Sequence, residues 1–281
     1  MTGAVLCKSN LRGADLSGAI LVGANLGGAD LRGVNLAHAQ MSNAVLSRAQ
    51  LSGARLTGAK LDGSDWFESV PGAVDLSGAV LTGCTFIKAD FSNARFIKAD
   101  ISDATFIECQ LDEANFSEST LEKATFVTCR GEGVMFQKCQ LAKAVFVHGC
   151  VFPEADFRDS HLEKANLRGT VLDGAKFDRA VMHGADLSEC DLSGGSLMGA
   201  ELEGALLIRT KLTNVSMRGA NLMDALASKT NIAGADFTGA NLYRADLSRA
   251  VRDAQTSFSE AKIDRVRVLP KAEVRKGVAD R

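Results

Sequence analysis

A repeat of five residues runs through almost the whole chain and limits what it can fold into. Steps of five from Leu6 reach Val151, and after one inserted residue the same step runs from Phe157 to Arg252. Of these 50 positions, 47 are apolar, and the exceptions are Pro71, Gly131 and Arg252. An α-helix needs a period near 3.6 and a half-buried strand a period of 2, so neither explains the pattern.

A second column, two residues before each large apolar position, holds small side chains. It is Ala at 31 of the 50 places and Ser, Thr, Cys, Val or Gly at the rest. One large and one small inward residue in every five suit a square coil, whose four sides of five residues make a turn of 20. Residues 20 apart should then stack. The predicted ladders on two opposite sides are Phe86, Phe106, Phe126 and Phe146, and Phe96, Phe116 and Phe136.

Several units read close to one motif: residues 14–18 are ADLSG, residues 185–189 are ADLSE and residues 240–244 are ANLYR. They resemble the A(D/N)LXX motif of the pentapeptide repeat family, and the resemblance extends over roughly residues 4–252. It implies an all-β fold, a right-handed quadrilateral β-helix. Fifty units at four per coil make 12 to 13 coils, and at about 4.8 Å per stacked strand the rod would be roughly 60 Å long.

The repeat predicts one β-helix over residues 1–252, with irregularities near 66–75 and 151–153. In the first, Pro71 falls on an inward position and is followed by Gly72, a turn signal. This segment either projects Trp66 and Phe67 for recognition of a partner or forms a bulged coil with Trp66 in the core. The insertion near 151–153 is interpreted as a bulge or kink between stacked segments.

Residues 253–281 are expected to form a C-terminal cap and a basic tail, with Phe258 and Ile263 as the last inward residues. Residues 262–281 contain seven Lys or Arg and three acids. They are either a solvated tail or an electrostatic handle for an acidic partner, to which Arg265, Arg267 and Lys271 would contribute.

Charge and composition exclude several classes of function. Lys plus Arg number 32 and Asp plus Glu 34, so the formal charge is −2 and gives no case for direct nucleic-acid binding. The sequence has no apolar run of about 18 residues and no signal-peptide pattern, which predicts a cytoplasmic protein without membrane insertion. Nearly all inward positions are apolar or small and the four histidines are scattered, so we expect no enzyme, cofactor or metal site.

The seven cysteines could suggest metal or disulfide chemistry. Five of them replace Ala in the small inward column, where a thiol fits as a small hydrophobe. These five are Cys84, Cys109, Cys129, Cys139 and Cys190. We therefore predict that all seven thiols are reduced.

An acidic cluster lies between residues 100 and 122, which contain seven acids and no Lys or Arg. Four of the acids occupy the second position after the inward residue, one on each side of the square, and form a collar: Asp103, Glu108, Glu113 and Glu118. The collar is either part of ion-pair ladders or, as in Qnr-type and mycobacterial gyrase-binding family members, part of a surface that mimics DNA. Ladders are favoured, since Lys88, Lys98, Lys123 and Lys138 lie one coil away from collar residues.

The function predicted from the sequence is a non-enzymatic scaffold for protein–protein interaction. Residues 241–249, Thr256 and the basic run ending at Pro270 resemble the end of family members associated with type VI secretion, which implies an accessory or adaptor role. The alternative, from the Cys-, Phe- and acid-containing middle, is a DNA-mimicking protein that binds gyrase or topoisomerase and confers quinolone protection.

The N-terminal end also predicts a partner, because an open coil exposes strand edges and core. Ala4 and Leu6 already fit the motif. We expect this end to be covered by a second copy stacked end to end, as in a two-fold head-to-head dimer, or by another protein. A bare end with small side chains is the alternative.

Overall fold

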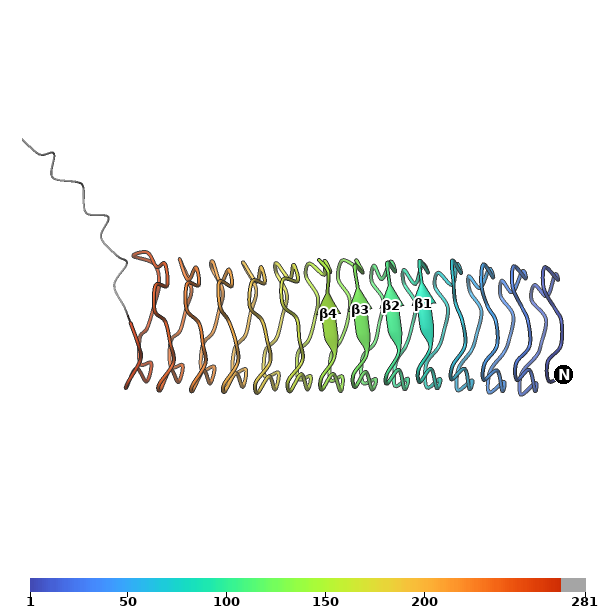
Figure 1. Cartoon of the computed structure of the whole chain (residues 1–281), viewed down its shortest axis with the longest axis horizontal. Coiled ribbons are helices and arrows are strands. Elements are labelled where there is room, and N and C mark those ends of the chain that lie inside the picture. The colour runs from blue at the N-terminus through green and yellow to red at the C-terminus, as the bar shows by residue number, and fades with distance from the viewer. Residues whose placement is uncertain (269–281) are drawn as a thin grey trace, which may run out of the picture.

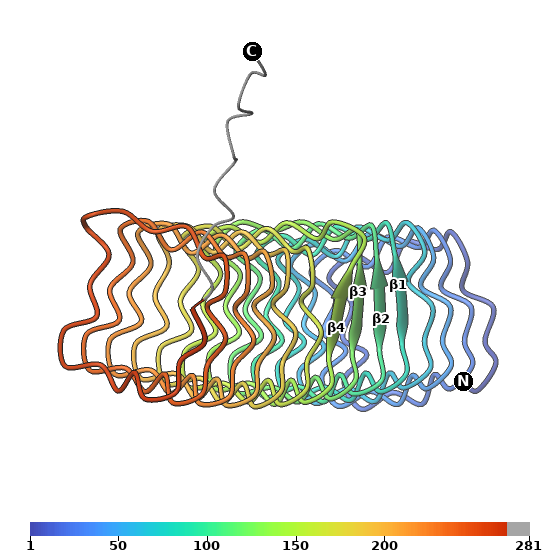
Figure 2. The ribbon, with the colours of Figure 1, turned by 60° about the vertical axis from the view of Figure 1, so that its left-hand side comes forward.

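The chain forms a straight rod of stacked coils (Figure 1), as a computed structural model of residues 1–268 shows. The coils follow one another along the rod axis, and the N-terminus lies at one end (Figure 2). Residues 1–268 contain no helix, and about one residue in each five-residue unit forms a parallel bridge with the residue about 20 positions later. The predicted all-β solenoid, a β-helix, is confirmed.

Four short strands form one parallel sheet in the order β1-β2-β3-β4. They are β1 (Thr85–Ile87), β2 (Thr105–Ile107), β3 (Thr125–Val127) and β4 (Val145–Val147). The register pairs Thr85 with Thr105 and Phe86 with Phe106. Elsewhere the coils are joined through single-residue bridges, such as the one between Asp15 and Asn35.

Nearly every corner of the square is a β-turn whose third residue has a positive φ. At one corner the Ala79 amide donates to the Leu76 carbonyl at 3.0 Å, and Gly78 between them has φ +66°. Glycine adopts this conformation without strain, which accounts for its frequency at this place in the repeat. The Asp or Asn of the motif supports the same turn, because its side chain accepts the amide two residues later; Asp75 accepts from Ser77 at 3.0 Å.

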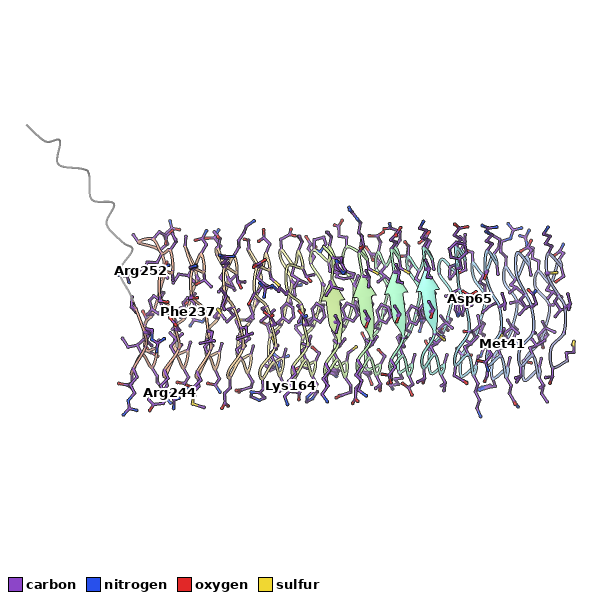
Figure 3. The ribbon with its side chains drawn as sticks, in the orientation of Figure 1. Met41, Asp65, Lys164, Phe237, Arg244 and Arg252 are labelled. Atoms are coloured by element: carbon purple, nitrogen blue, oxygen red, sulfur yellow. The ribbon has the colours of Figure 1, made fainter. Side chains whose placement is uncertain are left out.

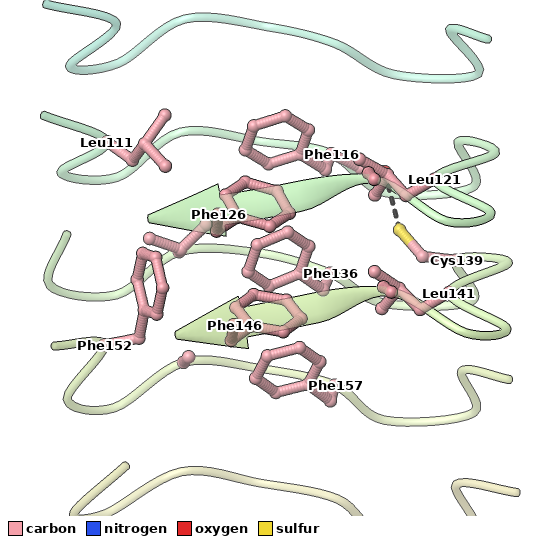
Figure 4. Close-up of a cluster of buried hydrophobic side chains, with 14 of the residues drawn as sticks. Leu111, Phe116, Leu121, Phe126, Phe136, Cys139, Leu141, Phe146, Phe152 and Phe157 are labelled. Atoms are coloured by element: carbon pink, nitrogen blue, oxygen red, sulfur yellow. Dashed lines mark hydrogen bonds between the residues drawn. The ribbon is translucent and has the colours of Figure 1, made fainter. Parts of the chain in front are cut away.

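The core is the column of inward side chains along the rod axis. From Leu21 to Leu242 the large inward residues are buried, and those of the middle form phenylalanine ladders (Figure 4). Ring centroids of Phe86 and Phe106 lie 4.5 Å apart, and those of Phe106 and Phe116, on opposite sides, lie 6.1 Å apart edge to face. Both predicted ladders are confirmed, and the second continues through Phe157 to Phe177.

Hydroxyl residues fit the small inward column where the turn satisfies them, although the buried Thr170 hydroxyl has no hydrogen-bond partner within residues 1–268. The Ser69 hydroxyl donates to the Trp66 carbonyl at 3.0 Å, and the Thr230 hydroxyl donates to the Ala227 carbonyl at 2.8 Å. A buried hydroxyl is costly only when it lacks such a partner. The column therefore accepts Ser and Thr as well as Ala.

The Pro71 segment does not project Trp66, which lies in the core as the second alternative expected. Trp66 is fully buried and the following coil keeps the five-residue step. An inward residue normally donates its amide to the next coil, as Leu76 does to the Arg95 carbonyl at 2.7 Å. Pro71 has no amide hydrogen, and Gly72 donates to the Asp90 carbonyl at 2.8 Å instead. The turn changes as well, since Gly72 and not Ala73 has the positive φ and the Val74 amide donates to the Gly72 carbonyl at 2.8 Å. The expected irregularity is therefore present and is confined to this turn.

The inserted residue lies at a corner, before the expected place at 151–153. His148 and Gly149 both have positive φ, +56° and +73°, so that corner contains one residue more than the others. Consequently Cys150 takes the small inward position and Phe152, not Val151, takes the large one. The rod continues past this corner without a break (Figure 1).

Coil stacking continues beyond residue 252. The amides of Phe237, Leu242 and Leu247 donate to carbonyls of Ser257, Lys262 and Arg267 at 2.8 to 2.9 Å. Phe258 stacks on Phe237 with 5.0 Å between centroids. Residues 253–268 therefore add a further coil to the β-helix. In this coil the side chain of Ile263 is 59% exposed.

Candidate protein-interaction surface

The sheet formed by β1–β4 defines one side of the square, here called side A; sides B, C and D follow it in chain order. Two outward residues per coil flank each inward residue on side A. From the N-terminus to β4 these 16 positions form the side A face: Val5, Cys7, Asn25, Gly27, Val45, Ser47, Asp65, Phe67, Thr85, Ile87, Thr105, Ile107, Thr125, Val127, Val145 and Val147. One of them is charged.

The charged exception is satisfied within its own coils. Asp65 accepts hydrogen bonds from the Ser47 hydroxyl at 2.9 Å and from the Phe67 amide at 3.1 Å. The side A face is therefore a stripe with a single charge, on a chain in which 23% of residues are charged. A partly exposed, mostly apolar patch of this kind, with charged residues along one edge, is characteristic of an interaction site.

The border on one edge of side A consists of the residues with positive φ at the following corner. In chain order this charged edge is Lys8, Gly28, Arg48, Glu68, Lys88, Glu108, Thr128 and His148. Arg48 pairs with Glu68 at 2.9 Å and Lys88 with Glu108 at 3.8 Å. Signs alternate over four coils, so neighbouring coils attract one another modestly.

The opposite edge, at the corner before side A, consists mainly of small side chains and carries few charges. This glycine edge consists of Gly3, Gly23, Asn43, Gly63, Gly83, Asp103, Lys123 and Lys143.

A groove interrupts the side A face near the N-terminal end. It has a volume of about 450 Å³ and is lined by Cys7, Lys8, Asn25, Gly27, Gly28, Ser47, Arg48 and Phe67. Gly27 and Gly28 contribute no side chains of their own to this space, which helps to leave it open. The guanidinium of Arg48 lies 5.8 Å from the centre of the Phe67 ring and forms one wall.

The predicted aromatic pair is divided between core and surface. The Trp66 indole donates to the Ser64 hydroxyl at 2.7 Å inside the rod, so it cannot touch a partner. Phe67 is half-buried and lies on the side A face. Of the two, Phe67 alone is placed for recognition.

The acidic collar is partly neutralised by stacked lysines. Glu108 pairs with Lys88, and Glu118 pairs with Lys98 at 3.5 Å. Within residues 1–268, Asp103 and Glu113 form no ion pair, and neither Lys123 nor Lys138 reaches a carboxylate. All four collar residues have positive φ, so they lie at four successive corners and do not converge on one face.

The expected basic handle is largely occupied with local contacts. Arg265 lies over the Tyr243 ring at 5.8 Å, and Arg267 pairs with Asp246 at 3.4 Å. Lys271 lies outside the described residues. Arg244 and Arg252 project at this end of the rod (Figure 3). Beside them is an apolar cavity of about 510 Å³ lined by Ile232, Leu247, Ala250, Arg252, Phe258, Ile263, Val266 and Val268.

The described part of the chain contains no cluster of side chains suited to a metal ion. No three His, Cys, Asp or Glu side chains lie together there as ligands would. All seven cysteines are free, and six, including Cys150, are buried. Burial raises the pKa of Cys84 to about 11 and of Cys190 to about 12, so these thiols stay protonated and unreactive near neutral pH. Nor does any helix in residues 1–268 have the length and apolarity to cross a membrane.

Comparison with protein families finds two profiles that together match most of the chain. "Pentapeptide repeat region" matches residues 79–148. "Pentapeptide repeats (8 copies)" matches residues 1–36, 29–65, 154–194, 196–226 and 220–251. A search of curated protein sequences found no match.

Solved structures of similar chains include HetL from the cyanobacterium Nostoc sp. strain PCC 7120, a pentapeptide repeat protein involved in heterocyst differentiation regulation. It is 24% identical over 84% of this chain and 91% of its own, with a TM-score of 0.24. QnrB1, a plasmid-mediated fluoroquinolone resistance protein, is 20% identical over 76% of this chain and 91% of its own, with a TM-score of 0.41.

Proposed function

Because the chain belongs to the pentapeptide repeat family, we propose that it is a non-enzymatic scaffold for protein–protein interaction. One observation carries the proposal: the inward positions are filled by apolar and small side chains, while the outward positions form regular columns at a fixed coil spacing. A surface of this kind offers a partner a long, rigid, pre-ordered face, as in other solenoids. Pre-ordering lowers the entropy lost on binding.

The finer proposal is an accessory or adaptor role in type VI secretion. Its support is the sequence of residues 241–249, followed by Thr256 and the basic run. Most of this stretch lies on the last coils. There Arg244 pairs with Asp224 at 2.8 Å, and the Arg265 guanidinium lies over the Tyr243 ring. An adaptor would present this end of the rod to a secreted effector.

The test is affinity purification from the native host with the tagged full chain as bait. Secretion components should be enriched over a matched bait in which Tyr243→Ala and Arg244→Ala alter the last coils. Equal enrichment by the two baits, or recovery of no secretion component, would contradict the adaptor role.

The second candidate is a gyrase- or topoisomerase-binding protein that gives quinolone protection. The acidic collar favours it, since Asp103 and Glu113 carry negative charge that no cation within residues 1–268 neutralises by an ion pair. The paired Glu108 and Glu118 weaken it. A supercoiling assay with purified gyrase and a fluoroquinolone decides, because protection at micromolar protein is expected of a DNA mimic and its absence would exclude this function.

The proposed partners include a second copy stacked on the N-terminal end. Leu6, Leu11 and Leu16 are only partly buried there, and Val5 is 76% exposed. Light scattering of the wild type and of Leu6→Asp tests this arrangement, and a protein that stays monomeric at tens of micromolar would refute it.

A further inference from the structure

We propose that the side A face is a self-association surface on which a second copy of this chain packs face to face, with the two rods antiparallel. The two-fold axis would lie between the coil of Phe67 and the coil of Ile87 and run along the strands. This inference is independent of either proposed partner and of the end-to-end contact.

The alternating charged edge is complementary to itself under this axis. The axis places each coil of one copy opposite the partner's coil that is equally far from the axis on its other side. Glu68 therefore faces the partner's Lys88, and Arg48 faces the partner's Glu108. By symmetry each pair occurs twice, giving four ion pairs around the centre, and complementary charge of this kind fixes register and orientation.

The glycine edge raises no opposing charge. Under the same axis Asp103 meets the partner's Asn43, Lys123 meets the partner's Gly23, and Lys143 meets the partner's Gly3. No like charges meet on this edge, and its glycines let the two faces approach closely.

The shape of the face is complementary to itself as well. Its half toward β4 carries the branched side chains of Ile107, Val127 and Val147, whereas its half toward the N-terminus is hollowed by the groove at Gly27. The axis places one half over the other, so that the partner's Val127 enters the groove. At the centre Phe67 packs on the partner's Ile87, and an aromatic ring in the middle of an interface is a common anchor of binding energy.

The buried area suits a reversible dimer. Eight coils at about 4.8 Å make a face roughly 38 Å long, and a width of about 15 Å gives roughly 600 Å² per copy. The total of roughly 1,200 Å² is at the lower limit for specific interfaces, a size typical of weak and transient association.

Sedimentation equilibrium of the purified full chain, up to about 100 µM, tests the proposal. The wild type should dimerise, and Ile87→Lys should weaken the dimer by roughly 30-fold because a charge replaces a central apolar contact. Ile97→Lys is the matched control, since Ile97 occupies the same position of the repeat on the opposite side C and is also half-buried.

A charge exchange provides a second test that leaves the apolar face intact. Lys88→Glu should weaken the dimer by about tenfold, and adding Glu68→Lys should restore it, because the two exchanged residues face each other across the axis. Lys98→Glu on side C is the matched single change and should have no effect. Circular dichroism shows whether each variant is folded. If Ile87→Lys does not fold, the charge-exchange variants at the exposed positions 68, 88 and 98 test the dimer on their own.

Several results would overturn the proposal. They are a monomeric wild type, equal weakening by Ile97→Lys, or no recovery in the double variant. Loss of the dimer in Leu6→Asp with an unchanged Ile87→Lys would assign association to the rod ends instead.

Discussion

Replacement of Phe106 by alanine should destabilise the rod more than the same kind of change at its end. Phe106 is fully buried, and its ring stacks on Phe86 at 4.5 Å and on Phe126 at 4.7 Å. Removal of a buried phenylalanine side chain costs about 3–5 kcal/mol, and each lost ring pair adds about 0.5–1.5 kcal/mol to what burial alone contributes. We expect a loss of about 5 kcal/mol in the free energy of unfolding.

The cavity cannot be relieved by collapse, which places the expected loss at the high end. Backbone hydrogen bonds fix the spacing between this coil and its neighbours, such as the bond that the Thr105 amide donates to the Cys84 carbonyl at 2.9 Å. For a chain of this size, 1 kcal/mol corresponds to about 2–4 °C, so Phe106→Ala should lower the melting temperature by about 10–20 °C.

Differential scanning calorimetry of Phe106→Ala beside Leu16→Ala measures the contrast. Leu16 packs on the core from the first coil and is only partly buried, so its replacement should cost less than about 2 kcal/mol. Equal shifts for the two variants, or a shift below about 3 °C for Phe106→Ala, would refute the packing argument.

Three further predictions concern thiols, glycines and acid. A thiol reagent should modify Cys7 alone in the native protein and all seven cysteines after unfolding, measured by absorbance; a disulfide or bound zinc would contradict this. Gly195→Ala should lower the melting temperature more than Gly83→Ala. A Cβ at Gly195 would lie 2.6 Å from a carbonyl oxygen, whereas a Cβ at Gly83 would meet no atom and would be disfavoured only by the backbone φ of +64°. The reverse order of melting temperatures would refute this. Hydrogen bonding from Arg179 lowers the pKa of the Asp159 carboxyl group. The stability that this ion pair contributes is therefore present above the ordinary carboxyl pKa near 3.8 and is lost as the pH falls below that value. Asp159→Asn should flatten the acid limb of a profile of melting temperature against pH, and an unchanged limb would contradict this.

The inward half of the structure could be predicted from the sequence because the repeat encodes it directly. A step of five identifies the core column, and a step of 20 identifies which rings stack, as for Phe96 and Phe116. The position of the inserted residue could not be found this way. A periodic count shows that one residue is extra but not which one, and the count assigned Val151 inward. The corner at His148 and Gly149 absorbs it because both residues can adopt positive φ.

The outward half was harder to predict, since its contacts depend on side-chain conformation. Lys88 and Lys98 pair with the stacked glutamates, yet Lys123 and Lys138 occupy equivalent places and do not reach a carboxylate within residues 1–268. A long exposed lysine gains little from one fixed geometry. The side A face did have a sequence signal, the recurrence of Thr-Phe-Ile or Thr-Phe-Val at Thr85, Thr105 and Thr125, but it appears only when outward columns are compared 20 residues apart.

A distance between two copies of Cys7 tests the face-to-face dimer most directly. Cys7 is the one exposed cysteine of the seven, so a spin label attaches to the wild-type chain at a single place. In the antiparallel arrangement the two Cys7 residues lie at opposite ends of an eight-coil contact, about seven coils apart, which is roughly 34 Å at 4.8 Å per coil. Pulsed electron paramagnetic resonance at about 100 µM should show a distribution centred near this distance. A distance below about 20 Å, as head-to-head stacking of the N-terminal ends would give, or no intermolecular distance at all, would contradict it.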